Sequence, residues 1–441
     1  MKKYLLLLTT VIAIVAGTPF ATGMMAEKQY HSMIQANMLK PTFNLETRHF
    51  RRGFFSSQAT TFIEIIDPAL RNSLSNRIAK DESGKVGVLV HHHLNHGPIT
   101  FTAEKNIDFE VAHITHQIEY QHFGKNSTDE KPADTNLFQL DSKLHFDGSQ
   151  TINIESQEIL TTADNATTTL MPLSMTFVTD RNFQTIKAEG NWKGVISEGL
   201  QGEKLNASDS EFGLDLKKNG ELWLGSMNIA QNSIVLNSSR VSFQMRDLKI
   251  KSNSFENGVD RLIDSSAQLS LQNVKTADKI FGPAQVSLAI NNIPATALER
   301  LNAIQQKAIN SPSASSDFAL QGAAVEALTL LPQLISHGIV IDVDKLYLNT
   351  PDGEIIGHFN LTLSKSNALS LMNIPHLKSI ITLDAALSLP VAIIPKATMH
   401  GKIQPLLDRG YLRMDGEYLK SVVKMRNSLL TMNDKIVPLP Y

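Results

Sequence analysis

Alternation of apolar and polar residues with a period of two is the feature of this sequence that most constrains its fold. Antiparallel strands that pack one face and leave the other to solvent or to a groove produce such a pattern. It recurs through 99–120, 138–160, 171–195, 212–250, 262–274, 286–290, 359–363 and 383–389. Lys218-Asn219-Gly220 is typical of a tight turn between two such strands. The sequence therefore predicts a long, mainly antiparallel β structure.

Three stretches with helical periodicity interrupt this pattern. They cover 27–39 before Pro41, 295–309 after Pro294, and 318–336 before a capping Gly338. Loops are predicted over 125–135, 202–210 and 311–316. The predicted fold class is thus α+β, mainly antiparallel β, with a sheet-rich body and a few packed helices.

The chain has 441 residues, which is more than one compact domain usually contains. A natural division lies near residue 270, before the helical pair. We expect a signal or membrane anchor over 1–26, a β-rich region over 27–270, and a second β-rich region with the helical pair over 271–441.

The composition excludes several classes of protein. The 41 basic side chains are balanced by 43 acidic ones, which argues against a nucleic-acid-binding protein because such a protein needs a basic surface. The chain has no cysteine, which excludes disulfides, thiolate nucleophiles and cysteine-ligated zinc. We therefore expect no nucleic-acid partner.

An apolar segment follows Lys2 and Lys3 at the start of the chain. Its strongly apolar core has the length of a signal-peptide core, and the uncharged stretch up to Glu27 is long enough to span ~30 Å of hydrocarbon. No clear cleavage site of the small-x-small kind follows. The basic residues precede the segment, so the remainder is predicted to lie outside the cytoplasm. We expect a retained membrane helix, the alternative being a cleaved signal.

Histidines are concentrated in one region of the chain. Seven of the fourteen are His91, His92, His93, His96, His113, His116 and His122. His91 and His93 share a face on any strand and could ligate zinc or copper, whereas His92 points the opposite way. No His-Glu-x-x-His motif accompanies them, so we favour exposed or hydrogen-bonded structural histidines. A metal site and a pH-sensing role stay open, and no metal ligand is assigned.

Two short motifs stand out near these histidines. In Arg51-Arg52-Gly53-Phe54-Phe55-Ser56-Ser57 the arginines could contact lipid head groups, but the favoured interpretation is a strand whose Phe54 and Phe55 pack in the core. His96-Gly97-Pro98 predicts a rigid turn that His96 could hydrogen-bond.

No known catalytic or nucleotide-binding motif is present. Asp342 and Asp344 occupy alternate strand positions and could share a face, although such pairs are usually solvated. We assign no catalytic residue and no cofactor, and we expect no enzymatic activity.

These motifs resemble the YdgA family of Gram-negative bacterial envelope proteins, whose function is unknown. The matching elements are Gly23, Ala26-Glu27 and Tyr30, then Arg52-Gly53-Phe54-Phe55-Ser56-Ser57, Asn95-His96-Gly97-Pro98, Pro351-Asp352-Gly353, Gly410-Tyr411-Leu412, Tyr418 and the closing 427–435 hairpin. Asp434 stands where the family more usually has glycine. The resemblance implies an inner-membrane anchor, a periplasmic body, and motif residues of unknown role: Arg52, Gly53, Phe54, Ser56, His96, Gly97 and Pro98.

Three functions are compatible with these observations. The first is non-enzymatic binding of a lipid or another envelope component in an apolar sheet groove, as in AsmA-type envelope proteins, which the body resembles at the level of fold. The second is a structural or assembly factor that binds a protein partner, for example at a sheet edge. The third is a histidine-dependent metalloenzyme. An open apolar groove would favour the first function over a filled core.

Overall fold

A computed structural model shows a protein built almost entirely from antiparallel strands. It describes residues 2–36, 42–68, 71, 84–97, 100–101, 107–119, 138–163, 166–199, 202–239, 241–258, 260–309, 326, 329–330, 333, 336–365, 378–395 and 398–438. Contacts divide the chain into two compact units. Unit 1 comprises Met1–Ile159, Pro172–Gly190 and Gln306–Leu320, and unit 2 comprises Leu160–Met171, Asn191–Gln305 and Gln321–Tyr441. The boundary near residue 270 remains a prediction.

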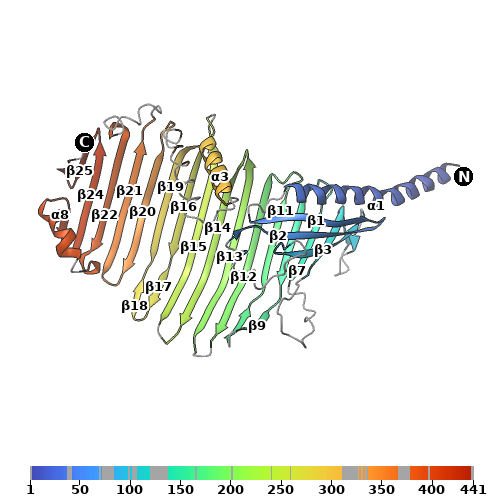
Figure 1. The fold of residues 1–441 in the computed structure, drawn as a ribbon, viewed down its shortest axis with the longest axis horizontal. Helices are drawn as coiled ribbons and strands as arrows, with labels where there is room; N and C mark the ends of the chain where they lie inside the picture. The colour runs from blue at the N-terminus through green and yellow to red at the C-terminus, as the bar shows by residue number, and fades with distance from the viewer. Residues whose placement is uncertain are drawn as a thin grey trace. The chain divides into compact units, whose positions relative to one another are not determined.

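Unit 1 is a sheet with one long helix packed along it (Figure 1). Its elements are α1 (Lys2–Ala36), β1 (Phe43–Arg52), β2 (Ser56–Ile65), β3 (Gly87–His96), β4 (Thr100–Phe101), β5 (Ile107–Asp108), β6 (Ala112–Glu119), β7 (Phe138–Leu144), β8 (Gln150–Ser156) and β11 (Leu173–Thr179). The strands pair antiparallel in the order β1, β2, β3, β6, β7, β8, β11. The separate β4 and β5 pair with each other.

The core of unit 1 lies between α1 and the face of the sheet that this helix covers. Ala26 and Tyr30 of α1 pack with Leu94 of β3, Ala112 of β6 and Leu144 of β7. Leu94 and Ala112 have no exposed surface at all. Burying these apolar side chains supplies the main force that holds the helix on the sheet.

Unit 2 holds the longest strands. Its elements, with β9 and β12 also reaching into unit 1, are β9 (Ile159–Ala163), β10 (Ala166–Leu170), β12 (Thr185–Glu198), β13 (Lys204–Asn219), β14 (Leu222–Asn237), β15 (Ser242–Asn257), β16 (Leu262–Leu271), β17 (Asn273–Thr276), β18 (Lys279–Phe281), β19 (Ala284–Pro294), α3 (Ala295–Ile309), β20 (Val340–Thr350), β21 (Gly353–Leu363), β22 (Ile381–Pro390), the short helices η2 (Val391–Ile393), η3 (Met399–Ile403) and α8 (Gln404–Asp408), β23 (Arg413–Asp415), β24 (Tyr418–Arg426), β25 (Leu429–Met432) and β26 (Lys435–Ile436).

Most strands of unit 2 pair antiparallel with the next strand in the chain, but β16 pairs with β19 and β22 with β24. The main order is β13, β14, β15, β16, β19, β20, β21, β22, β24, β25, β26. The predicted strands over 286–290, 359–363 and 383–389 are confirmed as parts of β19, β21 and β22. Gly220 turns the β13–β14 hairpin with a φ of 62°, as the Asn-Gly pair predicts.

The helix predictions have mixed outcomes. The helix predicted over 295–309 is confirmed as α3, whereas most of 318–336 and the loops over 125–135 and 311–316 lie outside the described residues. The loop predicted over 202–210 is wrong, because β13 begins at Lys204 and Leu205 already takes part in the strand pairing.

The N-terminal helix differs from its prediction. Instead of a separate helix over 27–39, α1 runs unbroken from Lys2 to Ala36 and contains Pro19. In the described part of the chain, no helix has the length and apolar character that crossing a membrane requires. The predicted membrane helix is therefore not supported.

The C-terminal hairpin shows how the chain accommodates Asp434. Asn433 and Asp434 both have positive φ, 47° and 64°, between β25 and β26. Asp and Asn tolerate this left-handed conformation better than most residues, so the turn forms without glycine. Asn433 is buried and its side chain accepts a hydrogen bond from Val422 N and donates to Tyr411 O.

Candidate functional site

The motif residues of unit 1 meet at one place, where α1 lies on the sheet. We call Pro19, Gly23, Ser57 and His96 the helix-docking site. A Cβ added to Gly23 would lie 2.7 Å from His96 Cε1, so only glycine lets the helix approach this imidazole so closely. His96 Nδ1 lies 3.0 Å from Pro19 O, and His96 Nε2 lies 3.1 Å from Ser57 Oγ.

The chemistry of these partners fixes the protonation of His96. The Pro19 carbonyl can only accept, so Nδ1 carries the proton, and Nε2 of the neutral ring accepts from the Ser57 hydroxyl. Burial lowers the pKa of His96, which agrees with a neutral imidazole. Ser57 is 1% exposed and His96 4%, so this serine–histidine pair holds the helix and is closed to a substrate.

Arg52 adds a polar contact beside this site. Its guanidinium pairs with Glu27 of α1 at 2.5 Å, and Arg52 Cζ lies 5.1 Å from the centroid of the Phe20 ring. Both charged side chains are about one third exposed, so the ion pair itself contributes at most about 1 kcal/mol. The Arg52–Glu27 pair therefore contributes little of the free energy that keeps α1 on the sheet.

Gly53, Phe54 and Phe55 form the turn that joins β1 to β2, and Ser56 begins β2. Gly53 N donates to Ser56 O, and a Cβ at Gly53 would lie 2.5 Å from that oxygen. The prediction that Phe54 and Phe55 pack in the core is wrong: they are 46% and 65% exposed, because both lie in the turn rather than in β2. Gly97 N donates to Val111 O, whereas Pro98 lies outside the described residues.

A second polar feature is a buried chain of hydrogen bonds across the sheet. Tyr30 OH lies 2.8 Å from Thr61 Oγ1, which lies 2.7 Å from His92 Nε2. The Nδ1 atoms of His92 and His116 hydrogen-bond each other, and His116 Nε2 lies 2.6 Å from Ser142 Oγ. One consistent direction of donation runs through all five side chains when both histidines are neutral.

Protonation of both histidines would break this chain, because each Nδ1 atom would then carry a hydrogen and the two N–H groups would face each other. Burial lowers the pKa of His92 to about 4, with a smaller contribution from His91. Burial also lowers the pKa of His116 well below its usual value, and His92 adds to the effect. Both rings are therefore neutral at physiological pH.

The other histidines lie where strand alternation predicts. His91 and His93 are exposed on the open face, and they line a hollow of about 540 Å³ with His49 and Gln117. His92 points to the covered face. His122 lies outside the described residues, and across the described ranges no group of three or more metal-ligating side chains converges.

His113 stands on the open face between two carboxylates. His113 Nδ1 lies 3.5 Å from Glu110 Oε1, and His113 Nε2 lies 3.7 Å from Asp141 Oδ1. The contact with Glu110 is the main cause that raises the pKa of His113. Glu110 and His113 are both buried, and their contact is an ion pair only while the imidazole is charged.

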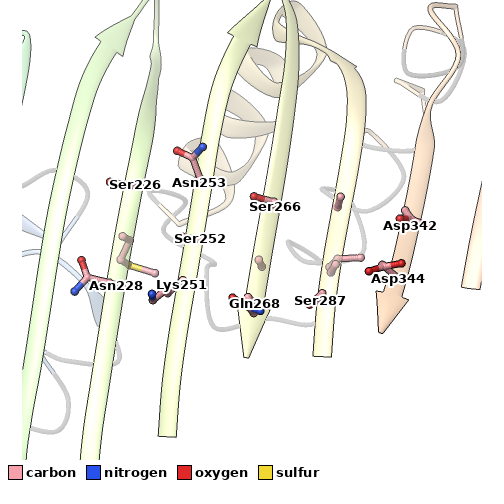
Figure 2. A pocket seen from close by; sticks show the side chains of 14 residues that line it. Ser226, Asn228, Lys251, Ser252, Asn253, Ser266, Gln268, Ser287, Asp342 and Asp344 are labelled. Carbon is pink, nitrogen blue, oxygen red and sulfur yellow. The ribbon is translucent and has the colours of Figure 1, made fainter. Parts of the chain in front are cut away.

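Unit 2 carries a hollow of about 650 Å³ on its sheet, lined by both polar and apolar residues (Figure 2). Asn228, Lys251, Gln268 and Ser287 form one register row across β14, β15, β16 and β19. Asp342 and Asp344, the carboxylates that the sequence places at alternate positions, both line it, and a strand irregularity separates them. The hollow is open to solvent rather than enclosed.

The opposite face of the same sheet is apolar. Ile229 follows Asn228 in β14, so it points to the face of the sheet opposite to Asn228. We call the register row that contains Ile229 the apolar row: Phe212, Ile229, Ile250, Leu269, Val286, Leu346, Gly357 and Leu387.

The side chains of the apolar row are not buried by a second layer. Ile229, Leu269 and Leu387 are 38%, 39% and 38% exposed, whereas the inner face of a sandwich is closed. At Gly357 an added Cβ would lie 3.2 Å from Leu346 Cδ2 and 3.3 Å from Leu387 Cδ1, so neighbouring leucines close the gap. The row is therefore a continuous, accessible apolar strip.

Sequence reasoning found part of these sites. It singled out His96, Ser57 and Gly23, but it missed Pro19, whose contribution is a backbone oxygen and leaves no sequence signal. It also missed Thr61 and Ser142, which only strand register brings to the histidines. The apolar row could have been found by aligning the alternating stretches across successive hairpins.

Comparison with known proteins identifies a family but no function. A family model described as a bacterial protein of unknown function, DUF945, matches residues 1–440. No curated protein and no solved structure matches the chain. The family match is compatible with the YdgA-like resemblance. Because the match covers almost the whole chain, the protein belongs to the DUF945 family of bacterial proteins.

Proposed function

We propose that this protein binds the acyl chain of a lipid along the apolar row of unit 2. The observation that carries the proposal is the row itself, in which apolar residues occupy one register row across eight strands. Ile229, Leu269 and Leu387 in this row keep more than a third of their surface exposed. Soluble proteins rarely leave so continuous an apolar strip open unless it binds something.

The dimensions fit such a ligand. Strands lie about 4.8 Å apart, so a row across eight strands is about 34 Å long. One acyl chain reaches across about half of the ~30 Å hydrocarbon core of a bilayer, so the row is long enough to hold it fully extended.

The energetics fit as well. Each methylene buried contributes about 0.8 kcal/mol, so about ten of them supply about 8 kcal/mol before the cost of association. The ligand needs no specific polar contact along the strip. Its head group would then lie beyond the row, and the acyl chain rather than the head group would set the affinity.

Two pairs of matched variants, one in β14 and one in β16, test the proposal. Ile229→Asp and Leu269→Asp place a charge in the apolar row, whereas Asn228→Asp and Gln268→Asp place the same charge one residue away on the polar face. Full-length protein is extracted in mild detergent, and bound lipid is counted by native mass spectrometry. Circular dichroism and limited proteolysis check that all four variants fold.

We expect the row variants to lose bound lipid about tenfold and the polar-face variants to retain it, because a desolvated carboxylate opposes an acyl chain. Equal lipid in all four variants, or none in the wild type, would overturn the proposal.

We also propose that the N-terminal segment tethers the body outside the cytoplasm, as the basic residues before Tyr4–Val15 suggest. Carbonate extraction of membranes and protease access in spheroplasts test this. A soluble protein, or a body that only lysis exposes to protease, would contradict it.

A further inference from the structure

One end of unit 1 carries a group of exposed phenylalanines. We call it the phenylalanine rim: Phe20, Phe54, Phe55, Phe109 and Phe146, which are 48%, 46%, 65%, 74% and 51% exposed. Phenylalanine is among the residue types most often buried, and single exposed ones are unremarkable only when scattered. These five belong to one edge.

Main-chain hydrogen bonds show that the rim is contiguous. They link consecutive strand ends, from His96 N to Phe55 O, from Gly97 N to Val111 O, and from Val111 N to Leu144 O. Phe109 lies two residues before Val111 in the chain, and Phe146 lies two residues after Leu144. Phe20 joins the same edge, because His96 also holds the carbonyl of the preceding Pro19.

Cations accompany the rim. Arg51 and Arg52 end β1 beside the turn of Phe54 and Phe55, and both are exposed. Arg181, also exposed, lies against Gly148 of the β7–β8 turn. The nearby carboxylates Asp147 and Asp180 accept hydrogen bonds within their own turns. Arginine beside exposed aromatic rings is the combination that favours the boundary between head groups and acyl chains.

Helix α1 leaves the sheet at this same edge. Towards its N-terminus it passes Phe20 and Pro19 and continues beyond β1, β2 and β3 (Figure 1). The residues of that continuation are Tyr4-Leu5-Leu6-Leu7-Leu8 and Val11-Ile12-Ala13-Ile14-Val15. The rim therefore lies at the end of unit 1 from which the most apolar stretch of the chain extends.

We propose that the phenylalanine rim inserts into the interfacial layer of a lipid bilayer, with Arg51 and Arg181 at the depth of the lipid phosphates. A protein partner or a second copy of the chain would not account for the apolar sequence that continues from the rim. The inference rests on the membrane location proposed above, but it is independent of what unit 2 binds.

Tryptophan quenching tests the inference in the full-length chain. Phe55→Trp and Phe109→Trp are each made in a background that carries Trp192→Phe and Trp223→Phe, which removes both native tryptophans. The control is Gln117→Trp, an exposed position on β6 away from the rim. Each protein is mixed with vesicles of phosphatidylethanolamine and phosphatidylglycerol, with or without brominated acyl chains.

We expect brominated lipid to lower the emission of both rim tryptophans about twofold and to leave the Gln117→Trp emission unchanged. Vesicle flotation separates the two proposals, since a chain that does not float with vesicles contradicts the membrane location and the rim together. A chain that floats without rim quenching overturns the rim alone. Protection of the rim from both bromine and aqueous acrylamide would show that protein covers it.

Discussion

Gly23→Ala is the substitution that most directly examines how α1 is held on the sheet. A methyl group here would lie 2.7 Å from His96 Cε1 and 3.1 Å from both imidazole nitrogens. Carbon atoms prefer about 3.5–4.0 Å, so the ring or the helix must move by about 1 Å. His96 is buried and hydrogen-bonded at both nitrogens, so the movement disrupts those bonds.

The magnitude follows from three contributions. Overpacking costs about 1–3 kcal/mol, and each weakened hydrogen bond of His96 costs about 1 kcal/mol. Alanine in place of glycine favours the helix by about 1 kcal/mol, which offsets part of this loss. We expect Gly23→Ala to lower the free energy of opening α1 by about 2–4 kcal/mol.

Gly23→Ala should change the opening free energy of α1 in the opposite direction when the imidazole of His96 is absent. In a His96→Ala background the clash disappears and only the helix propensity remains, so Gly23→Ala should stabilise α1 by up to about 1 kcal/mol. Hydrogen exchange of peptides from 18–36 in the full-length protein measures the opening free energy. The same effect of Gly23→Ala in both backgrounds would refute the docking role of His96.

Two further predictions concern protonation and a turn. Since the pKa of His92 is about 4 against about 6.5 in an unfolded chain, the unfolded state binds the extra proton first as pH falls. Unit 1 should therefore lose about 3 kcal/mol of stability between pH 6.5 and 4, more with His116, and His92→Gln should flatten this dependence. Denaturant titrations across this range measure it, and a pH-independent midpoint would contradict it. Asn433→Ala should cost about 2 kcal/mol more than Asp434→Ala, since both residues have positive φ but only Asn433 has buried hydrogen bonds. Thermal unfolding of both variants measures the difference, and equal losses would contradict the role of those bonds.

Period-two alternation predicted most of the strands because it is a local signal. The strands over 286–290, 359–363 and 383–389 each pair with strands that also alternate between apolar and polar residues. Their apolar residues therefore lie on the same face of the sheet as those of the paired strands. The same rule placed His92 opposite to His91 and His93. It failed over 202–210, where polar residues of β13 alternate too weakly to be separated from a loop.

The errors at the motif residues arise from information that is not local. Phe54 and Phe55 were predicted in the core because their type is usually buried, yet the Gly53 turn places them outside the sheet. The contact of His92 with His116 depends on strand register over 24 residues of sequence. The docking of α1 depends on a backbone oxygen of Pro19, which no residue pattern encodes.

The separation of the sheet into an apolar and a polar face is the centre of the functional proposal. Alternation alone predicts two different faces, but only the accessible surface of Ile229, Leu269 and Leu387 shows that the apolar one is open. The proposal therefore depends on accessibility rather than on composition.

Photocrosslinking with a long-chain fatty acid that carries a diazirine tests that proposal most directly. The probe is added to full-length protein in mild detergent, and the labelled residues are mapped by mass spectrometry. Adducts at Ile229, Ile250 and Leu269, with Asn228 and Gln268 unlabelled, are the predicted result. Adducts spread equally over both faces, or confined to the phenylalanine rim, would contradict lipid binding along the apolar row.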